Sequence, residues 1–241
     1  MTYDGLDGRG LERLTGAPFV EIHASLPSTL DVAHELGARG APSGALVLAD
    51  EQTAGRGRHG RAWHSPAGAG LWLAVLLRPA RAPVGGALAI RAGLAAVDAI
   101  AHAVPEVGPR LRWPNDLIAA GRKAGGILCE ARWSGERLGW AAVGVGINVR
   151  GPVPVELADR AIALQDLALG LTRVVLLAAL APRIAALADR PPELEDGERE
   201  QFGAVCWVEG EGARDAATVD REGALLVRTG AGLLDRRVFP F

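Results

Sequence analysis

The part of the sequence that decides the fold is residues 110–130, RLRWPNDLIAAGRKAGGILCE. Its two ends predict strands, and Pro114 stops the first strand and turns the chain between them. Asn115 and Asp116 can therefore face a site at the end of that strand. Lys123 follows Asp116 by seven residues and begins the next strand. This stretch predicts a carboxylate and an ammonium close together at one edge of a sheet.

Helix and strand signals alternate on both sides of this segment, which predicts an α/β or α+β layer. The central strands are expected to be buried, because their apolar residues are nearly continuous. The expected strands cover residues 19–23, 45–49, 71–77, 110–113, 126–133 and 138–149. One helix is expected after Ser28 and Thr29, which offer N-cap oxygens, and it ends at Gly37. Further helices are expected over 84–104 and 164–188, with a break near Pro182.

The two ends of the chain differ from its centre. Residues 1–18 are rich in glycine and charge and are expected to form a loose terminus. Residues 190–201 contain two prolines and five acidic residues, which predicts a solvated linker. Beyond it, short strands separated by glycines predict a small β-barrel, over 204–208, 216–219, 224–227 and 233–239. We therefore expect a main domain over 19–195 and a small C-terminal domain over 196–241.

The composition fits an ordinary globular protein, because 241 residues with 49% hydrophobic content can bury a full core. The net charge of -2 gives no overall attraction to nucleic acid or to anionic membranes. Two cysteines without paired spacing, and the absence of a signal peptide or of an apolar span of roughly 18 residues, predict a cytoplasmic location. Of the 26 basic residues only Lys123 is a lysine. It is either a surface lysine that drift has kept or a position where a guanidinium cannot replace a compact ammonium.

Residues 55–61, GRGRHGR, carry the strongest local signal for a binding site. Glycines let backbone amides approach a ligand closely, and arginines donate paired hydrogen bonds to carboxylates and phosphates. The segment therefore predicts a loop for a ligand with several anionic oxygens. It also matches the dinucleotide-binding fingerprint, but residues 61–66 do not open the helix that this fingerprint requires. A flexible RNA-binding arginine-glycine segment is the other alternative, but such segments normally repeat.

Two glycines interrupt the last buried strand, at Gly144 and Gly146. Glycine within a strand marks either a bulge or a ligand that lies against the backbone. A Walker A loop is excluded at Lys123, because Arg122 precedes this lysine and Ala124 follows it.

The sequence resembles the biotin protein ligases in four segments that follow the family's order and spacing: 55–61, 113–116, 123–130 and 144–148. The resemblance covers about residues 19–190 plus a short tail. It implies an α+β fold with a mixed β-sheet flanked by helices, of the class II aminoacyl-tRNA synthetase-like type, and a small SH3-like β-barrel at the C-terminus. It also implies that ATP, with Mg²⁺, activates biotin as biotinoyl-AMP. The biotin would then pass to a lysine of the biotin carboxyl carrier protein of acetyl-CoA carboxylase or of a related enzyme.

The resemblance further implies roles for individual residues. Biotin would be bound by Ser28, Thr29, Gln52, Gly55, Arg56, Arg58, Lys123, Gly144 and Gly146. ATP or the adenylate would be bound by Arg56, Arg58, Arg61, Trp63, Asn115, Lys123 and Asn148. The catalytic residues would be Lys123, Arg58 and Asp116. Lys123 would hold the biotin carboxylate against the α-phosphorus, whereas Asp116 would act on the acceptor lysine or bind Mg²⁺.

The chain departs from the family pattern at two places, with Leu30 where asparagine is common and His59 where a further arginine is common. A lipoate or octanoate ligase, a nucleic-acid-binding module and a non-catalytic biotin-binding protein are the competing hypotheses. We expect no DNA binding, because residues 1–18 are too few for the winged helix-turn-helix that some relatives carry. We also expect no membrane partner, and a monomer or a homodimer.

Overall fold

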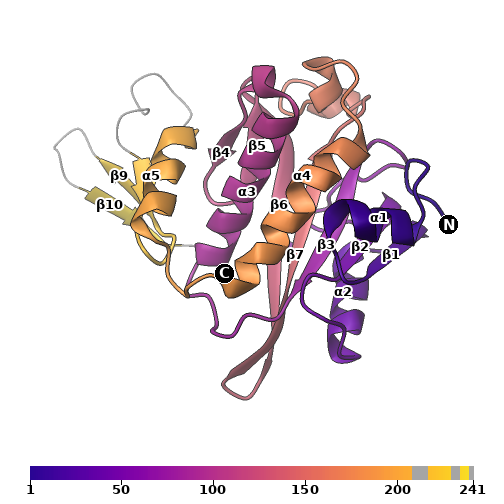
Figure 1. Ribbon diagram of the computed structural model, residues 1–241. Coiled ribbons are helices and arrows are strands. Elements are labelled where there is room, and N and C mark those ends of the chain that lie inside the picture. The colour runs from indigo at the N-terminus through magenta and orange to yellow at the C-terminus, as the bar shows by residue number, and fades with distance from the viewer. Residues whose placement is uncertain (208–216, 229–233, 239–241) are drawn as a thin grey trace.

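The computed structural model describes residues 1–207, 217–228 and 234–238, and its centre is a seven-stranded mixed sheet (Figure 1). The strand order is β1-β2-β3-β7-β6-β5-β4, in which β1 and β2 are parallel and the other neighbours are antiparallel. The strands are β1 Val20–Leu26, β2 Leu46–Gln52, β3 Gly70–Leu77, β4 Arg110–Arg112, β5 Asp116–Ala119, β6 Arg122–Ser134 and β7 Arg137–Asn148. The expected strands are confirmed, and β5 is one that the sequence did not predict.

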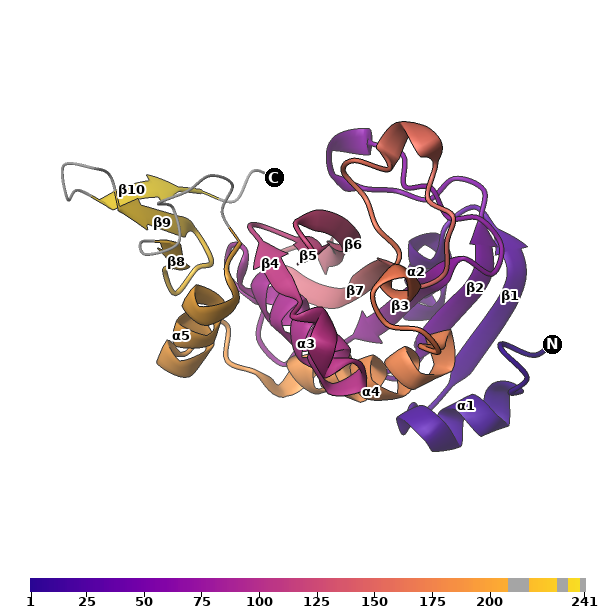
Figure 2. The same ribbon diagram turned by 90° about the horizontal axis from the view of Figure 1, so that it is seen from above.

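Five helices belong to the described residues: α1 Gly8–Thr15, α2 Thr29–Ala38, α3 Ala87–Ala103, α4 Arg173–Ala185 and α5 Asp196–Val205. Helices α1, α3 and α4 lie along one face of the sheet (Figure 2). Helix α2 packs on β2, β3 and β7 and covers the other face. The mixed sheet with helices on both faces confirms the expected α+β fold.

Each central strand buries both of its faces, which explains its continuous apolar sequence. In β2, Leu46 and Leu48 belong to the core beneath α1, α3 and α4, whereas Val47 and Ala49 belong to the core beneath α2. This alternation follows from the two-residue period of a strand, in which successive side chains point to opposite faces. The smaller core, under α2, is the one that adjoins the site.

The N-terminal segment is folded, so the expectation of a loose terminus over residues 1–18 is wrong. The side chain of Asp7 caps α1 by accepting a hydrogen bond from the amide of Gly10 at 2.8 Å. Tyr3 and Leu11 are 2% and 0% exposed. The two buried side chains anchor the segment to the core, although the glycines and charges around them conceal this in the sequence.

Helix α4 begins at Arg173, so the helix that was expected from residue 164 is shorter than predicted. Thr172 sets the start, because its hydroxyl accepts a hydrogen bond from the amide of Val175. Pro182 lies in the last turn of α4 and does not break it. Proline has no amide to donate to the carbonyl of Ala178, so α4 continues past Pro182 with one helical hydrogen bond fewer.

The expectation of a solvated linker over residues 190–201 is also wrong, because α5 begins within it at Asp196. Phe202 is fully buried, and Glu198 pairs with the buried Arg91 of α3 at 2.8 Å. Glu198, one of these acidic residues, thus holds α5 against α3. The strand expected over 204–208 is wrong for 204 and 205, which end α5, and residue 208 lies outside the described residues.

A second, three-stranded antiparallel sheet follows α5, in the order β10-β9-β8, which confirms the expected small C-terminal sheet. Its strands are β8 Ala217–Val219, β9 Leu225–Arg228 and β10 Leu234–Arg237. Residues 216, 233 and 239 of the expected strands lie outside the described residues. The indole of Trp113 donates a hydrogen bond to the carbonyl of Gly223 at 2.9 Å, which ties this sheet to the strand-end turn after β4. The domain division between residues 195 and 196 stays a prediction.

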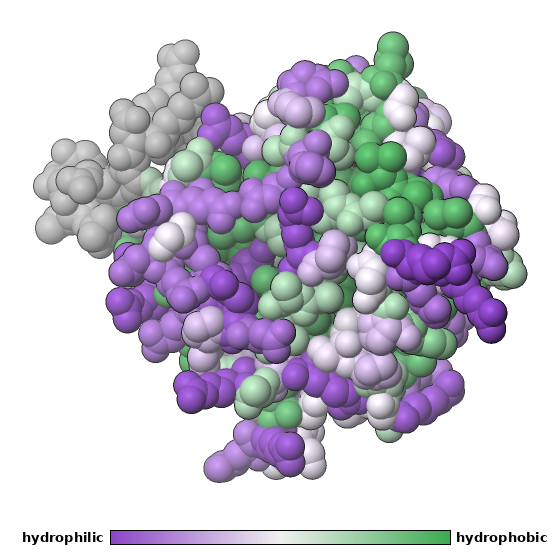
Figure 3. Space-filling model, viewed as in Figure 1, coloured by the Kyte–Doolittle hydropathy of each residue, from purple (hydrophilic) through white to green (hydrophobic). Residues whose placement is uncertain are grey.

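The surface is mixed, with hydrophilic side chains over much of the face in Figure 3 and a hydrophobic area at its upper right. Leu169 and Val175, close to the start of α4, are 97% and 50% exposed. None of the helices in the described part of the chain has the length and apolar character needed to cross a membrane.

Candidate active site

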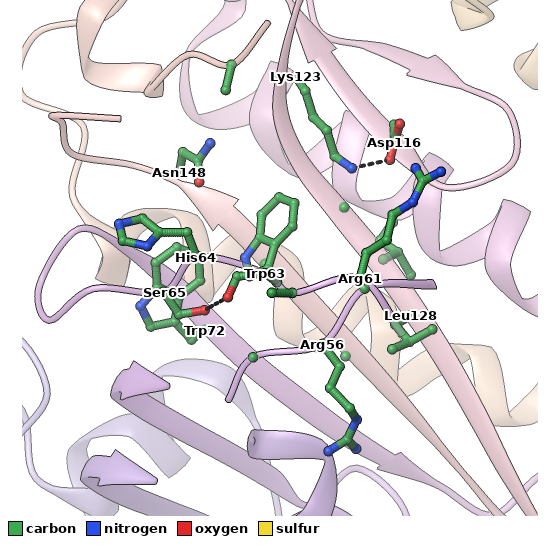
Figure 4. A pocket seen from close by; sticks show the side chains of 18 of the residues that line it. Arg56, Arg61, Trp63, His64, Ser65, Trp72, Asp116, Lys123, Leu128 and Asn148 are labelled. Atoms are coloured by element: carbon green, nitrogen blue, oxygen red, sulfur yellow. Dashed lines mark hydrogen bonds and ion pairs between the residues drawn. The ribbon is translucent and has the colours of Figure 1, made fainter. Parts of the chain in front are cut away.

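All of the predicted site residues line one open pocket of about 1160 Å³ on the α2 face of the sheet. Figure 4 shows a part of it, with side chains from the arginine-glycine loop, β3, β5, β6 and β7. The predicted residues that it gathers are Ser28, Thr29, Gln52, Gly55, Arg56, Arg58, Arg61, Trp63, Asn115, Asp116, Lys123, Gly144, Gly146 and Asn148. The four sequence segments that suggested chemistry therefore form a single site.

The charges of the pocket lining differ in sign from the charge of the whole chain. Its lysine and arginine side chains number seven: Arg56, Arg58, Arg61, Arg112, Lys123, Arg150 and Arg160. Its carboxylates number two, Asp116 and Asp159. Since the chain as a whole carries a net charge of -2, the positive charge is concentrated in this pocket. The site is built for an anionic ligand.

Lys123 and Asp116 form the ion pair that the sequence predicted, with Nζ and Oδ1 2.6 Å apart (Figure 4). Arg112 holds the other carboxylate oxygen, Oδ2, also at 2.6 Å. The Lys123 ammonium lies 5.0 Å from the ring centroid of Trp63, within the range of a cation–π interaction. The predicted ammonium–carboxylate pair thus forms part of a larger cluster that includes Arg112.

The hypothesis that Asp116 binds Mg²⁺ does not fit this geometry. Both of its oxygens already accept hydrogen bonds or ion pairs from cations, and a metal ion would have to displace them. In residues 1–207, 217–228 and 234–238 no group of three or more His, Cys, Asp or Glu side chains could hold a metal ion. The arrangement assigns Asp116 to holding Lys123.

The arginine-glycine loop is a hairpin with a regular base. The amide of Gly57 donates to the carbonyl of Arg61 at 2.7 Å, and the amide of Trp63 donates to the carbonyl of Gly55 at 2.8 Å. A side chain at Gly55 would place its Cβ 2.5 Å from the carbonyl oxygen of Trp63, so only glycine fits at this position. The tip turns with φ of 70° at Gly60, a conformation that glycine adopts without strain.

One of the three loop arginines, Arg56, points in another direction than the other two. Arg58 and Arg61 lie toward the Asp116 side of the pocket, where Arg58 donates to the Asn115 side chain at 3.4 Å. Partial burial lowers the pKa of the Arg58 guanidinium, Asp116 opposes this shift, and Arg61 adds to it. Arg56 points away from Arg61 (Figure 4), and its guanidinium lies 2.8 Å from Asp31. Arg56 lines the pocket while its guanidinium pairs with Asp31, and its predicted contact with ligand oxygens stays a prediction.

Gln52 connects the start of α2 to Ser65, which follows the loop. Its Oε1 accepts hydrogen bonds from the Thr29 amide at 2.9 Å and from the Thr29 hydroxyl at 3.1 Å. Its Nε2 donates to the Ser65 hydroxyl at 3.0 Å. Ser28 and Thr29 are 2% and 3% exposed. These polar groups make a fixed, narrow end of the pocket.

The two strand glycines make room for side chains of this chain. A Cβ at Gly144 would come within 3.0 Å of Leu30, and a Cβ at Gly146 within 2.5 Å of the Trp63 indole nitrogen. In this structure Leu30 and Trp63 occupy the space beside these glycines, and the contact of a ligand with this strand stays a prediction. The Trp63 Nε1 is buried and has no hydrogen-bond partner among the described residues, so a ligand acceptor could satisfy it.

Sequence reasoning missed several residues of the pocket. Arg112 directly precedes the Trp-Pro-Asn-Asp segment, and its position two residues before the strand-ending proline could have indicated it. Residues 152–161 gave no signal, yet they form one wall. They are held there because the Lys123 amide donates to the Arg160 carbonyl at 2.8 Å and the Ile162 amide donates to the Lys123 carbonyl at 3.0 Å.

Comparison with known proteins places this geometry in a family. Residues 23–148 match the biotin/lipoate A/B protein ligase family. The chain is 36% identical over 203 residues to the biotin–acetyl-CoA-carboxylase ligase of Mycobacterium tuberculosis, covering 78% of this chain and 74% of that protein. It is 40% identical over 153 residues to the bifunctional ligase/repressor BirA of Bacillus subtilis, covering 61% of this chain and 46% of that protein. The chain thus spans about half the length of the latter relative.

The fold agrees with this assignment. The biotin protein ligase from Aquifex aeolicus in complex with biotin and ATP superposes with a TM-score of 0.70 at 24% identity, over 91% of this chain and 95% of that chain. The family match covers the loop, Trp113 to Asp116, Lys123 and the two strand glycines, which are the segments that line the pocket. The chain therefore belongs to the biotin/lipoate A/B protein ligase family.

Proposed function

We propose that the protein is an ATP-dependent biotin protein ligase that acts in the cytoplasm. The observation that carries the proposal is the concentration of seven cationic side chains against two carboxylates in one pocket, with the single lysine of the chain among them. A carboxylic acid and ATP are both anions, and they can meet only where the surrounding charge offsets their repulsion. The relatives from M. tuberculosis and A. aeolicus, by their names, are biotin ligases, which supports biotin as the acid.

The reaction has two steps that balance without any further reagent. In the first, a biotin carboxylate oxygen attacks the α-phosphorus of ATP, and the bond to pyrophosphate breaks. Arg58 and Arg61 would stabilise charge on the phosphates, and Lys123 would hold the carboxylate, because their cations face the same part of the pocket. Positioning two bound reactants can contribute about 7 kcal/mol or more to lowering the barrier. ATP would enter as its Mg²⁺ complex, with the metal held by the phosphates.

In the second step a neutral lysine amine of the acceptor attacks the carbonyl of the mixed anhydride, the bond between that carbon and the phosphate oxygen breaks to release AMP, and the proton lost by the amine passes to water or to the phosphate of AMP. The acceptor would be the biotin carboxyl carrier protein of acetyl-CoA carboxylase or of a related enzyme. Lys123 would polarise the carbonyl, and Asp116 would hold the Lys123 ammonium in place. ATP-dependent attachment of biotin to one lysine of a purified carrier domain, located by mass spectrometry, tests the proposal. Attachment of lipoate or octanoate instead would assign the chain to the lipoate branch of the family.

Arg58→Gly should increase the release of biotinoyl-AMP about tenfold. The variant removes a charged donor from the pocket side of the loop while keeping the loop flexible. Released adenylate is measured by single-turnover trapping with hydroxylamine. Because the chain has one lysine, the escaped adenylate should label bystander proteins far more than the enzyme. The control is Arg81→Gly, an exposed arginine outside the pocket; release by Arg58→Gly at the control level would show that Arg58 does not retain the adenylate.

Gly146→Ala should lower the rate of adenylate formation about tenfold or more, whereas Gly144→Ala should have a smaller effect. The new methyl group at Gly146 would meet the Trp63 indole at 2.5 Å, so the ring must leave its present position beside the Lys123 ammonium. At Gly144 the methyl group would meet the flexible side chain of Leu30 at 3.0 Å. Both rates are measured by pyrophosphate exchange. Equal rates for the two variants would show that the position of Trp63 does not matter for this step.

A further inference from the structure

A polar chain behind the arginine-glycine loop links the base of that loop to α2. Its members are Trp140 on β7, His34 on α2, Glu130 on β6 and Arg56 in the loop. Of these only Arg56 lines the pocket, and His34 is 9% exposed. We propose that His34 is a positioning residue, which acts through Glu130 to hold Arg56 and thereby fixes the arginine-glycine loop over the pocket.

The hydrogen bonds of His34 define its tautomer. The Trp140 indole is a donor only, and its Nε1 lies 3.0 Å from His34 Nδ1, so Nδ1 must be the acceptor. The hydrogen of the neutral ring is then on Nε2, which donates to Glu130 Oε2 at 2.8 Å. Trp140 itself is fixed, because it packs on Gly37, where a Cβ would come within 2.5 Å of the indole nitrogen. His34 thus accepts a hydrogen bond from Trp140 and donates one to Glu130.

Glu130 passes this constraint to the loop. With Oε2 held by His34, Oε1 faces the Arg56 guanidinium, whose Nη2 lies 3.5 Å away. Arg132 also approaches Glu130, at 3.7 Å, but its side chain is half-exposed. The hydrogen bond from His34, together with Arg56, holds the pKa of Glu130 below its usual range despite burial, so the carboxylate stays charged.

Arg56 is held from two sides at the base of the hairpin. Its other nitrogen, Nη1, lies 2.8 Å from Asp31, which is one turn before His34 on α2. Its backbone pairs with Ala62 in a β-bridge, between the two hydrogen bonds that close the hairpin. A side chain that is fixed on α2 and β6 therefore also fixes the hairpin that carries Arg58 and Arg61. This explains why the Arg56 guanidinium pairs with two carboxylates although the residue lines the pocket.

The test is amide hydrogen exchange in the enzyme without substrates, read at the amides of Gly57 and Trp63, which close the hairpin. His34→Leu should raise their exchange rates about tenfold, the effect expected when a hydrogen bond to a charged group is lost. His34→Gln should restore protection, because its carboxamide can accept from Trp140 and donate to Glu130. His102→Leu, an exposed histidine on α3, is the matched control and should change nothing.

A double-mutant cycle with Arg56→Met decides whether His34 acts through Arg56. Arg56→Met alone should raise the same exchange rates, and adding His34→Leu should raise them no further. An additive rise in the double variant, or a rise that extends equally to core amides of β3 and β7, would overturn the proposal. If His34→Leu does not fold, Glu130→Gln takes its place in the cycle, because it removes the charge and keeps the shape.

The consequence for catalysis rests on the proposed function. His34→Leu should increase release of biotinoyl-AMP to about the level of Arg56→Met, measured by hydroxylamine trapping, with little change in the KM for biotin. Hydrogen exchange in the substrate-free enzyme does not depend on any activity. If amide hydrogen exchange changes as expected but neither the wild type nor any variant forms adenylate, the ligase function is contradicted. The role of His34 in holding the loop would still stand.

Discussion

Lys123→Met should reduce biotin-dependent exchange of pyrophosphate into ATP by about 100-fold or more. Methionine keeps much of the length and volume of lysine but removes the ammonium that we propose to hold the biotin carboxylate. The change also leaves Asp116 with Arg112 as its cation, so that the pocket loses a positive charge at the place where the two anions meet. Exchange is measured with saturating biotin and labelled pyrophosphate.

The matched control for this prediction is the neighbouring residue. Arg122→Met removes a cation from the same strand, but Arg122 donates to the carbonyl of Ala158 and is not part of the pocket lining. Arg122→Met should exchange pyrophosphate at a rate within about twofold of the wild-type rate, as expected when a cation at a distance from the reacting groups is removed. A Lys123→Met variant that folds and exchanges as fast as Arg122→Met would remove Lys123 from the mechanism.

Arg173→Met should lower the free energy of unfolding by about 3 kcal/mol, because it removes a buried guanidinium that donates charged hydrogen bonds to two partly exposed carboxylates, of which only Asp4 keeps a second cation, Arg150. Arg173 is 4% exposed and pairs with Asp4 at 2.5 Å and with Asp50 at 2.6 Å. Its guanidinium also lies 4.3 Å from the ring centroid of Tyr3. One side chain on α4 thus ties the N-terminal segment to the end of β2, and the variant should lose all of these contacts.

The measurement is urea unfolding followed by circular dichroism, with Arg39→Met as control. Arg39 forms an exposed pair with Glu35 on α2, and its loss should change the stability by no more than about 0.5 kcal/mol.

Burial alone would raise the pKa of Asp4, but the hydrogen bond and charge of Arg173 outweigh it, so the pKa lies below its usual range. The contribution of Asp4 is therefore present above about pH 4 and is lost as pH falls through its folded pKa. The difference in the free energy of unfolding between wild type and Arg173→Met should become smaller in acid. Equal free energies of unfolding at pH 7 would contradict the prediction.

Strand positions and the site were predictable because both depend on local sequence. Continuous apolar runs such as 71–77 bury both faces of a strand, and glycine, arginine and proline mark the turns at the strand ends. The single lysine was informative because every other basic residue is an arginine. Each of these features acts within a few neighbouring residues of the sequence.

What the sequence could not give are the pairings between distant residues. Arg173 stabilises the N-terminal segment from α4, and Arg91 docks α5, and neither pairing leaves a local pattern. The direction of Arg56 depends on Asp31 and Glu130, which come from two other elements. The resemblance implied three loop arginines that bind one ligand; all three line the pocket, and tertiary contacts pair Arg56 with Asp31 and Glu130, whereas Arg58 and Arg61 lie toward Asp116.

The most direct test of the central claim is acid-dependent exchange of labelled pyrophosphate into ATP by the wild-type protein with Mg²⁺, run in parallel with biotin, lipoate and octanoate. It isolates the adenylation step from any carrier protein. We predict exchange with biotin and none above background with the other two acids. Exchange with lipoate or octanoate but not with biotin, or no exchange with any acid by the folded protein, would contradict the assignment of biotin ligase activity.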